Sequence, residues 1–91
     1  MKYGVRLLEQ AIYTIGERDR EYGAITPLAV ELAKRWSITL GVEITPQKAM
    51  LCLIDLKLAR LSSNPAHTDS MVDVAGYIAC LAEISQEVKH G

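Results

Sequence analysis

The sequence predicts an all-α protein, a compact single domain of four helices, from three observations. Apolar residues recur at helical spacing, proline follows threonine at two places where a helix can start, and glycine stands at two places where one can stop. No segment alternates apolar and polar residues over a useful length, so no β-sheet is expected. The 91 residues suffice for one domain, and they contain no linker and no internal repeat.

The first helix is expected over residues 3–22. Its apolar residues follow one another at steps of three or four, which is the spacing of one face of an amphipathic helix. The members of this stripe are Val5, Leu8, Ile12 and Ile15, and Leu7 and Ala11 widen it. Gly23 favours a helix end there, because glycine readily adopts the left-handed conformation that closes many helices.

The second helix is expected over residues 27–40. Thr26 supplies a hydroxyl that can cap a helix, and Pro27 suits the first helical position because its ring fixes a helical φ. The apolar residues then recur at a spacing of four, at Leu28, Leu32, Trp36 and Leu40. Gly41 is the expected end.

The third helix, expected over residues 46–61, begins with the same threonine–proline signal at Thr45. It is apolar nearly all round, and only Asp55, Lys57 and Arg60 interrupt it. A helix without a polar face is surrounded by protein. We therefore expect it to be the central helix of the domain or to face a second subunit, and we expect a homo-oligomer.

The fourth helix is expected over residues 69–88. Its apolar residues fall on one side, at Met71, Val74, Ala75, Ile78, Leu81 and Ala82. The loop before it, residues 62–68, is rich in turn formers and too short to let the flanking helices separate. The third and fourth helices should therefore form an antiparallel hairpin.

Composition excludes several classes of function. The net charge is −1 and the basic residues are spread along the chain, so no DNA or RNA partner is expected. No apolar run is long enough to span a membrane, and Glu9 interrupts any signal-peptide core. The chain is therefore expected inside the cell, and the isolated Cys52 and Cys80 are interpreted as reduced core thiols.

Four charged residues form the main candidate site. Lys57 and Arg60 share one face of the third helix, Asp69 and Asp73 share one face of the fourth, and the hairpin brings the two pairs together. One interpretation is structural: Asp69 caps the fourth helix, and Asp73 pairs with Lys57 or Arg60. The other is a binding site, in which Lys57 and Arg60 hold phosphate and Asp69 and Asp73 hold Mg²⁺.

Other residues extend this candidate site. Tyr77 lies near the stripe of Asp69 and Asp73, where it can stack on a ligand or hydrogen-bond to it. Gly76 lies in a helix interior, where glycine costs about 1 kcal/mol relative to alanine and needs a reason such as the close approach of a helix or a ligand. The polar cluster of residues 18–23 is either a solvated helix end or, through Arg18 or Arg20 and Tyr22, the mouth of the same site. His67 either touches a ligand or is simply exposed.

Four segments together resemble a known family. They are Arg20-Glu21-Tyr22-Gly23, residues 36–46 from Trp36 to Pro46, Leu56-Lys57-Leu58-Ala59-Arg60-Leu61, and Asp69-Ser70-Met71-Val72-Asp73-Val74-Ala75-Gly76-Tyr77. The chain is similar there to small phage and prophage proteins of unknown function, over about 70 of its 91 residues. That family is in turn distantly similar to the MazG-like all-α nucleotide pyrophosphohydrolases.

The resemblance implies an oligomeric helical phage protein in the bacterial cytoplasm. MazG-like enzymes bind Mg²⁺ through a Glu-x-x-Glu pair and a Glu-x-x-Asp pair, and they cleave nucleoside triphosphates to monophosphate and pyrophosphate. This sequence departs from that pattern, because Asp55 is the only acid of the third helix and Asp69 and Asp73 are four residues apart. The first expectation is thus a protein that binds, and if it is an enzyme hydrolyses with Mg²⁺, a nucleotide or another phosphorylated small molecule. The alternative is a non-enzymatic interaction protein, either an inhibitor of a host defence protein or a sponge for nucleotide signals.

Overall fold

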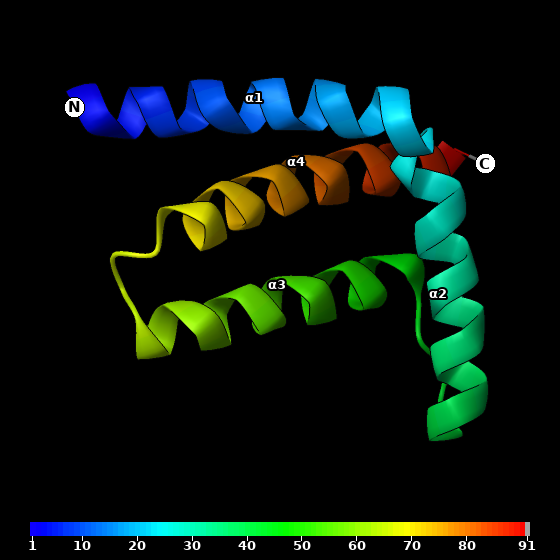
Figure 1. The fold of residues 1–91 in the computed structure, drawn as a ribbon. Helices are drawn as coiled ribbons and strands as arrows, with labels where there is room; N and C mark the ends of the chain where they lie inside the picture. The colour runs from blue at the N-terminus through cyan, green and yellow to red at the C-terminus, as the bar shows by residue number, and fades with distance from the viewer. Residues whose placement is uncertain (91) are drawn as a thin grey trace.

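The computed structural model describes residues 1–90, with side chains for residues 1–87, and shows four helices (Figure 1). They are α1 (Lys2–Tyr22), α2 (Ile25–Leu40), α3 (Pro46–Ser63) and α4 (Thr68–His90). No strand occurs among these 90 residues, so the all-α prediction is confirmed. The ends of α3 and α4 differ from the predicted ends by one or two residues.

Three helices lie side by side, and the fourth crosses one end of them (Figure 1). α4 lies between α1 and α3 and packs on α1, α2 and α3. α3 and α4 form the predicted antiparallel hairpin, whereas α1 runs in the same direction as α4. The expectation that the third helix is central within one chain is wrong, since α4 takes that place. Large apolar side chains of α3 therefore remain about half exposed, at Leu51, Leu56 and Leu58.

Small residues form the helix contacts. The buried core includes one alanine on α1, two on α2 and one on α3, which are Ala11, Ala29, Ala33 and Ala49. Ala29 packs with the fully buried Met50 and Ile84 where α2, α3 and α4 meet. The predicted apolar stripes follow these contact lines only in part. On α1, Ala11 is buried and Ile15 is partly buried, whereas Val5, Leu8 and Ile12 are exposed. Leu28 and Leu40 of α2 are exposed beside their buried alanines, because helices approach most closely where the side chains are short.

Three helix ends follow the sequence signals. Thr45 caps α3, and its hydroxyl oxygen accepts a hydrogen bond of 3.1 Å from the backbone N–H of Lys48. Gly23 and Gly41 close α1 and α2 with positive φ angles of 80° and 71°. The predicted start of the second helix is wrong, because α2 begins two residues before Pro27.

α2 begins at Ile25, with Ala24 as its N-cap and no side-chain cap. Thr26 is therefore inside the helix rather than before it. Its hydroxyl donates a hydrogen bond to the carboxylate of Glu87 on α4 instead of accepting one from the backbone. The threonine–proline dipeptide thus has two roles: Thr45 caps α3, whereas Thr26 joins α2 to α4.

We expect Thr45→Ala to lower the free energy of unfolding by about 1 kcal/mol, because a backbone N–H of α3 loses its partner. Thr45→Ser should retain most of this stability, since serine caps equally well. Thr26→Ala should cost less, because no backbone group of α2 depends on that hydroxyl. Urea unfolding followed by circular dichroism measures the three losses. An equal loss for Thr26→Ala and Thr45→Ala would contradict the different roles of the two threonines.

Within residues 1–90, none of the four helices combines the length and the apolar character that a membrane-spanning helix needs.

Candidate functional site

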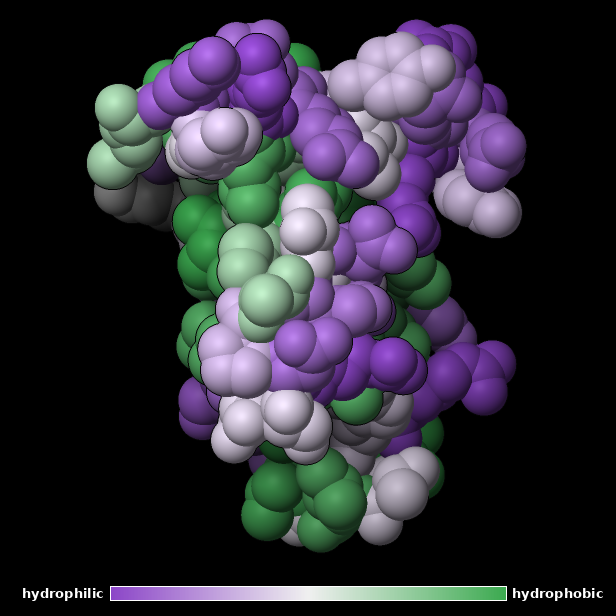
Figure 2. Space-filling view, turned by 60° about the vertical axis from the view of Figure 1, so that its left-hand side comes forward, coloured by the Kyte–Doolittle hydropathy of each residue, from purple (hydrophilic) through white to green (hydrophobic). Residues whose placement is uncertain are grey.

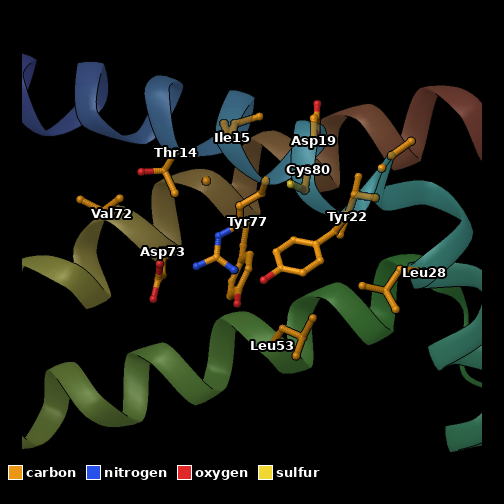
Figure 3. Close-up of a pocket in the computed structure, with 15 residues that line it drawn as sticks. Thr14, Ile15, Asp19, Tyr22, Leu28, Leu53, Val72, Asp73, Tyr77 and Cys80 are labelled. Carbon is orange, nitrogen blue, oxygen red and sulfur yellow. The ribbon is translucent and has the colours of Figure 1, made fainter.

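The main candidate site is a cavity of about 190 Å³ between α1 and α4, which also reaches the start of α2 and the middle of α3 (Figure 3). Its wall is largely apolar. The apolar residues that line it include Ile15, Ile25, Leu28, Leu53 and Val72. A concave, mostly apolar site with a few polar groups is the usual form of a small-molecule site.

Two tyrosines line this cavity from different helices. Tyr22 comes from the last turn of α1 and Tyr77 from the middle of α4, and in Figure 3 both side chains extend toward α3. Tyr77 is partly buried and packs against the core, whereas Tyr22 is largely exposed. Each tyrosine has an apolar ring and a polar tip, so together they can contact a flat ring and hydrogen-bond to its edge.

Charged groups stand at the margin of the cavity. Arg18 and Asp19 line it from α1, and Asp73 lines it from α4. The Nζ atom of Lys57 lies 3.0 Å from Oδ2 of Asp73, and these two side chains are only 18% and 23% exposed. The predicted pairing of Asp73 with Lys57 is therefore present, and it joins α3 to α4. Asp73 lines the apolar cavity, and Lys57 lies beside it as the partner of Asp73.

The other two predicted charges lie elsewhere. Arg60 lines a separate, shallow depression together with Asn64 and His67. Asp69 is exposed in the first turn of α4, and it does not cap the helix as predicted, because α4 begins one residue earlier at Thr68. Among the side chains of residues 1–87, no ion pair reaches Arg60 or Asp69. The structure therefore brings together Lys57, Asp73 and Tyr77, but not the whole predicted set.

The described side chains form no group of three or more histidine, cysteine, aspartate or glutamate residues suited to a metal ion. Asp69 and Asp73, one turn apart on α4, are the two carboxylates predicted for Mg²⁺. His67 is partly buried, and its Nδ1 atom lies 2.7 Å from the hydroxyl oxygen of the buried Ser70. This histidine therefore supports the start of α4.

The polar cluster of residues 18–23 contributes to the same cavity. Arg18 and Tyr22 line it, as the second interpretation of that cluster expected, whereas Arg20 pairs with Glu17 within α1. Cys80 and Thr14 also line it, although neither was predicted as a site residue. Cys80 continues the helical face of Asp73 and Gly76, and this spacing is a local signal for it. Thr14 has no such signal, because only the packing of α1 on α4 brings it to the cavity.

The two cysteines differ in their surroundings. Cys80 lines the cavity. The pKa of its thiol is raised, mainly because the thiol is partly buried and also because the nearby carboxylate of Asp19 disfavours the negative thiolate. Cys52 is exposed on α3, so the interpretation of both residues as core thiols is wrong for Cys52. α3 leaves one side uncovered, and Cys52 lies on it.

Comparison with known proteins places the chain in a family. The model of a domain of unknown function (DUF6378) matches residues 6–85. The Gene 55 protein of Mycobacterium phage L5 is 36% identical over 70 residues, which cover 76% of this chain and 45% of that protein. The Gene 55 protein of Mycobacterium phage D29 is 34% identical over 86 residues, which cover 93% of this chain and 57% of that protein.

The chain thus spans about half the length of the curated relatives that it matches. No solved structure is significantly similar to the chain. The resemblance to phage proteins of unknown function is confirmed by these relatives. They do not connect the chain to the MazG-like enzymes, so that resemblance stays a prediction.

Proposed function

This chain belongs to the DUF6378 family, and from that premise we propose that it binds a nucleotide or another phosphorylated small molecule in the cavity between α1 and α4. One observation carries the proposal: two tyrosines and Asp73 line one apolar cavity, and Asp73 holds the largely buried Lys57 beside it. Such a site offers a flat apolar surface for a base and, beside it, a cation for phosphate.

The base would lie against Tyr77 and Tyr22. The position of Tyr77 is supported by its packing against the core cluster, so it is the more rigid of the two. Tyr22 is largely exposed at the end of α1, where it can close over a ligand that has already entered.

The phosphate would lie at the edge of the cavity, near Lys57 and Arg18. In the free protein Lys57 is neutralised by Asp73. A phosphate group that enters can take over Lys57, because charge-assisted bonds to phosphate are strong. Arg60 lines a different depression, so the proposal gives Arg18 the role of the second phosphate-binding cation.

Mg²⁺ would enter with the phosphate. Magnesium sites on phosphate substrates commonly use one or two protein carboxylates, with substrate oxygens and water completing the set. Asp73, once released from Lys57, and Asp69 one turn away fit that pattern. In a MazG-like hydrolysis the ion would neutralise charge on the phosphate oxygens, while Lys57 and Arg18 orient the phosphate chain.

Gly76 supports a site of this kind. It lies in the interior of α4 and lines the cavity, yet an added Cβ would meet only Cγ1 of Ile15 at 3.8 Å, which is ordinary contact. The packing of α1 on α4 therefore does not require glycine here. Since glycine costs about 1 kcal/mol in a helix interior, the space that it leaves in the cavity is its best explanation.

Calorimetric titration with nucleoside mono-, tri- and cyclic phosphates, each with and without Mg²⁺, tests the proposal. We expect at least one to bind, and Tyr77→Ala to weaken its binding about tenfold or more, because the stacking surface is lost. Gly76→Ala should weaken binding while leaving the fold equally or more stable. The matched control is Tyr13→Ala, since Tyr13 is an exposed tyrosine of α1 outside the cavity.

The cysteines provide an independent measurement of where the ligand binds. A bound ligand should slow the reaction of Cys80 with a thiol reagent and leave the exposed Cys52 unchanged as an internal reference. Equal protection of both thiols, or binding that Tyr77→Ala does not affect, would place the ligand outside this cavity.

Turnover is a separate question. Release of pyrophosphate from a nucleoside triphosphate with Mg²⁺ or Mn²⁺, lost in a folded Asp73→Asn variant, would support the MazG-like enzyme. Binding without turnover would support a sponge for nucleotide signals. No binding to any of these nucleotides would remove the nucleotide proposal.

The second candidate is a non-enzymatic interaction protein, such as an inhibitor of a host defence protein. It is favoured by the large apolar side chains that the fold leaves exposed on α1 and α3. Figure 2 shows hydrophobic side chains at the surface of the molecule beside polar ones. Large apolar side chains that lie exposed side by side commonly mark a protein interface.

A further inference from the structure

The apolar stripe of α1 lies uncovered in the single chain. Val5, Leu8 and Ile12 follow at steps of three and four, and their exposed fractions are 49%, 54% and 70%. α1 instead packs on α4 through a neighbouring line that includes the buried Ala11. Three large aliphatic side chains in a row on a helix are the usual form of a surface that packs on another helix.

The amino-terminal half of α1 also extends beyond the helix that it packs on. In Figure 1 its first turns reach past the start of α4 and past the loop that precedes it. Of residues 2–10, only Gly4 and Leu7 are even partly buried. An isolated helix of this length is marginal in water, so these turns need a partner to be well ordered.

The molecule has more surface than a folded chain of its size. Its accessible surface is 6449 Å², whereas a monomer of 10.0 kDa is expected to have about 5,200 Å². Its radius of gyration is 14.1 Å, against an expected value of about 12 Å for a compact domain of this length. The surplus, about 1,200 Å² per chain, exceeds the roughly 800 Å² that each partner of a standard interface buries.

We propose that the stripe formed by Val5, Leu8 and Ile12 is the interface with a second copy of this chain, and that the two α1 helices pack antiparallel about a two-fold axis. Leu8 is the middle residue of the stripe, so Leu8 meets its counterpart near the axis and Val5 meets the partner's Ile12. A two-fold interface uses the same patch on both subunits, and a single apolar stripe satisfies this requirement by itself. The antiparallel arrangement also opposes the two helix dipoles favourably.

The exposed leucines of α3 fit such an interface less well. Leu51 and Leu58 lie on one side of the helix, but Asp55 lies between them, four residues after the first and three before the second. Packing that surface on a second copy would bury a carboxylate at the centre of the contact. On α1, Glu9 stands in the same relation to Val5 and Ile12, but the exposed Leu8 widens that stripe on the side away from Glu9. The equivalent residue of α3, Ile54, is buried in the core, so the exposed apolar surface of α1 is the better one for a helix pair.

Sedimentation equilibrium of the wild-type protein at micromolar concentration should give twice the chain mass of 10.0 kDa. Leu8→Glu should weaken the dimer about 100-fold or more, because two apolar side chains leave the interface and two like charges meet. The matched control is Tyr13→Glu, an equally exposed site on the same helix, which lies about 140° away around the helix axis. It should leave the dimer unchanged.

A cross-link tests the geometry without adding charge. In a Cys52→Ser background, which removes the exposed native thiol, Leu8→Cys should form a disulfide-linked dimer under mild oxidation, and Tyr13→Cys should not. A wild-type monomer at every concentration would overturn the proposal. So would a dimer that survives Leu8→Glu but dissociates on Leu58→Glu, which would place the interface on α3, or equal cross-linking through both α1 positions.

Discussion

Ile84→Ala is expected to lower the free energy of unfolding by about 2–5 kcal/mol, the largest loss that we predict for a single substitution. Ile84 is completely buried and packs with Ala29 and Met50 where α2, α3 and α4 meet. Removing three carbon atoms there leaves a cavity that three helices cannot close together. In a domain of this size the midpoint of thermal unfolding should fall by about 10 °C or more.

Ile78→Ala is the matched control, because Ile78 is the same residue type on the same helix but is half exposed. We expect its cost to be below about 1 kcal/mol. Both variants must be melted at one protein concentration, since association would make the midpoint depend on concentration. Equal losses at the two positions would show that the core cluster does not hold the helices together.

Asp73→Ala is expected to lower the free energy of unfolding by about 1–3 kcal/mol if its ion pair is structural, because Lys57 is left largely buried without a partner. Replacing both residues by apolar ones, as in Lys57→Met with Asp73→Leu, should recover part of this loss. Asp69→Ala is the control. That carboxylate lies on the same helix but is exposed, so its loss should stay within about 0.5 kcal/mol.

The opposite result would be informative about function. Residues selected for binding often reduce stability, and their replacement then leaves the melting temperature unchanged or raises it. An Asp73→Ala protein that is as stable as the wild type would therefore favour a ligand site over a purely structural pair. Thermal and urea unfolding of the single and double variants distinguish these outcomes.

The fold could be predicted from the sequence because helix ends depend on local chemistry. Gly23 and Gly41 close their helices whatever surrounds them, since few other residues adopt a positive φ so readily. The failure at Thr26 has a tertiary cause. Its hydroxyl bonds to Glu87, sixty-one residues later in the chain, and no local pattern reports such a partner.

The buried faces could not be predicted in the same way. Apolar periodicity predicted for α1 a broad stripe, of which only the side with Ala11 and Ile15 faces α4 and the side with Val5, Leu8 and Ile12 is exposed. The helices approach most closely at short side chains such as Ala11 and Ala33, which the periodicity of large apolar residues does not single out. If a second copy covers Val5, Leu8 and Ile12, these residues are buried in the dimer, and the apolar periodicity of α1 then predicts their burial correctly.

Part of the candidate site was accessible to sequence reasoning. Lys57 and Asp73 are connected by a short hairpin, so their pairing follows from the loop length. Arg18 lines the cavity only because α1 packs on α4, and no sequence pattern between the two helices predicts that α1 packs on α4 rather than on α2 or α3. The cavity between α1 and α4 could therefore not be predicted from the sequence.

The parallel packing of α1 on α4 has a consequence for the order of folding. α1 has its principal contacts with α4, which follows it by two helices in the sequence, while the α3–α4 hairpin closes through a short loop. Closing a long loop costs more entropy than closing a short one. During synthesis α1 must therefore wait until α4 has been made, and the cavity between these two helices cannot form before then.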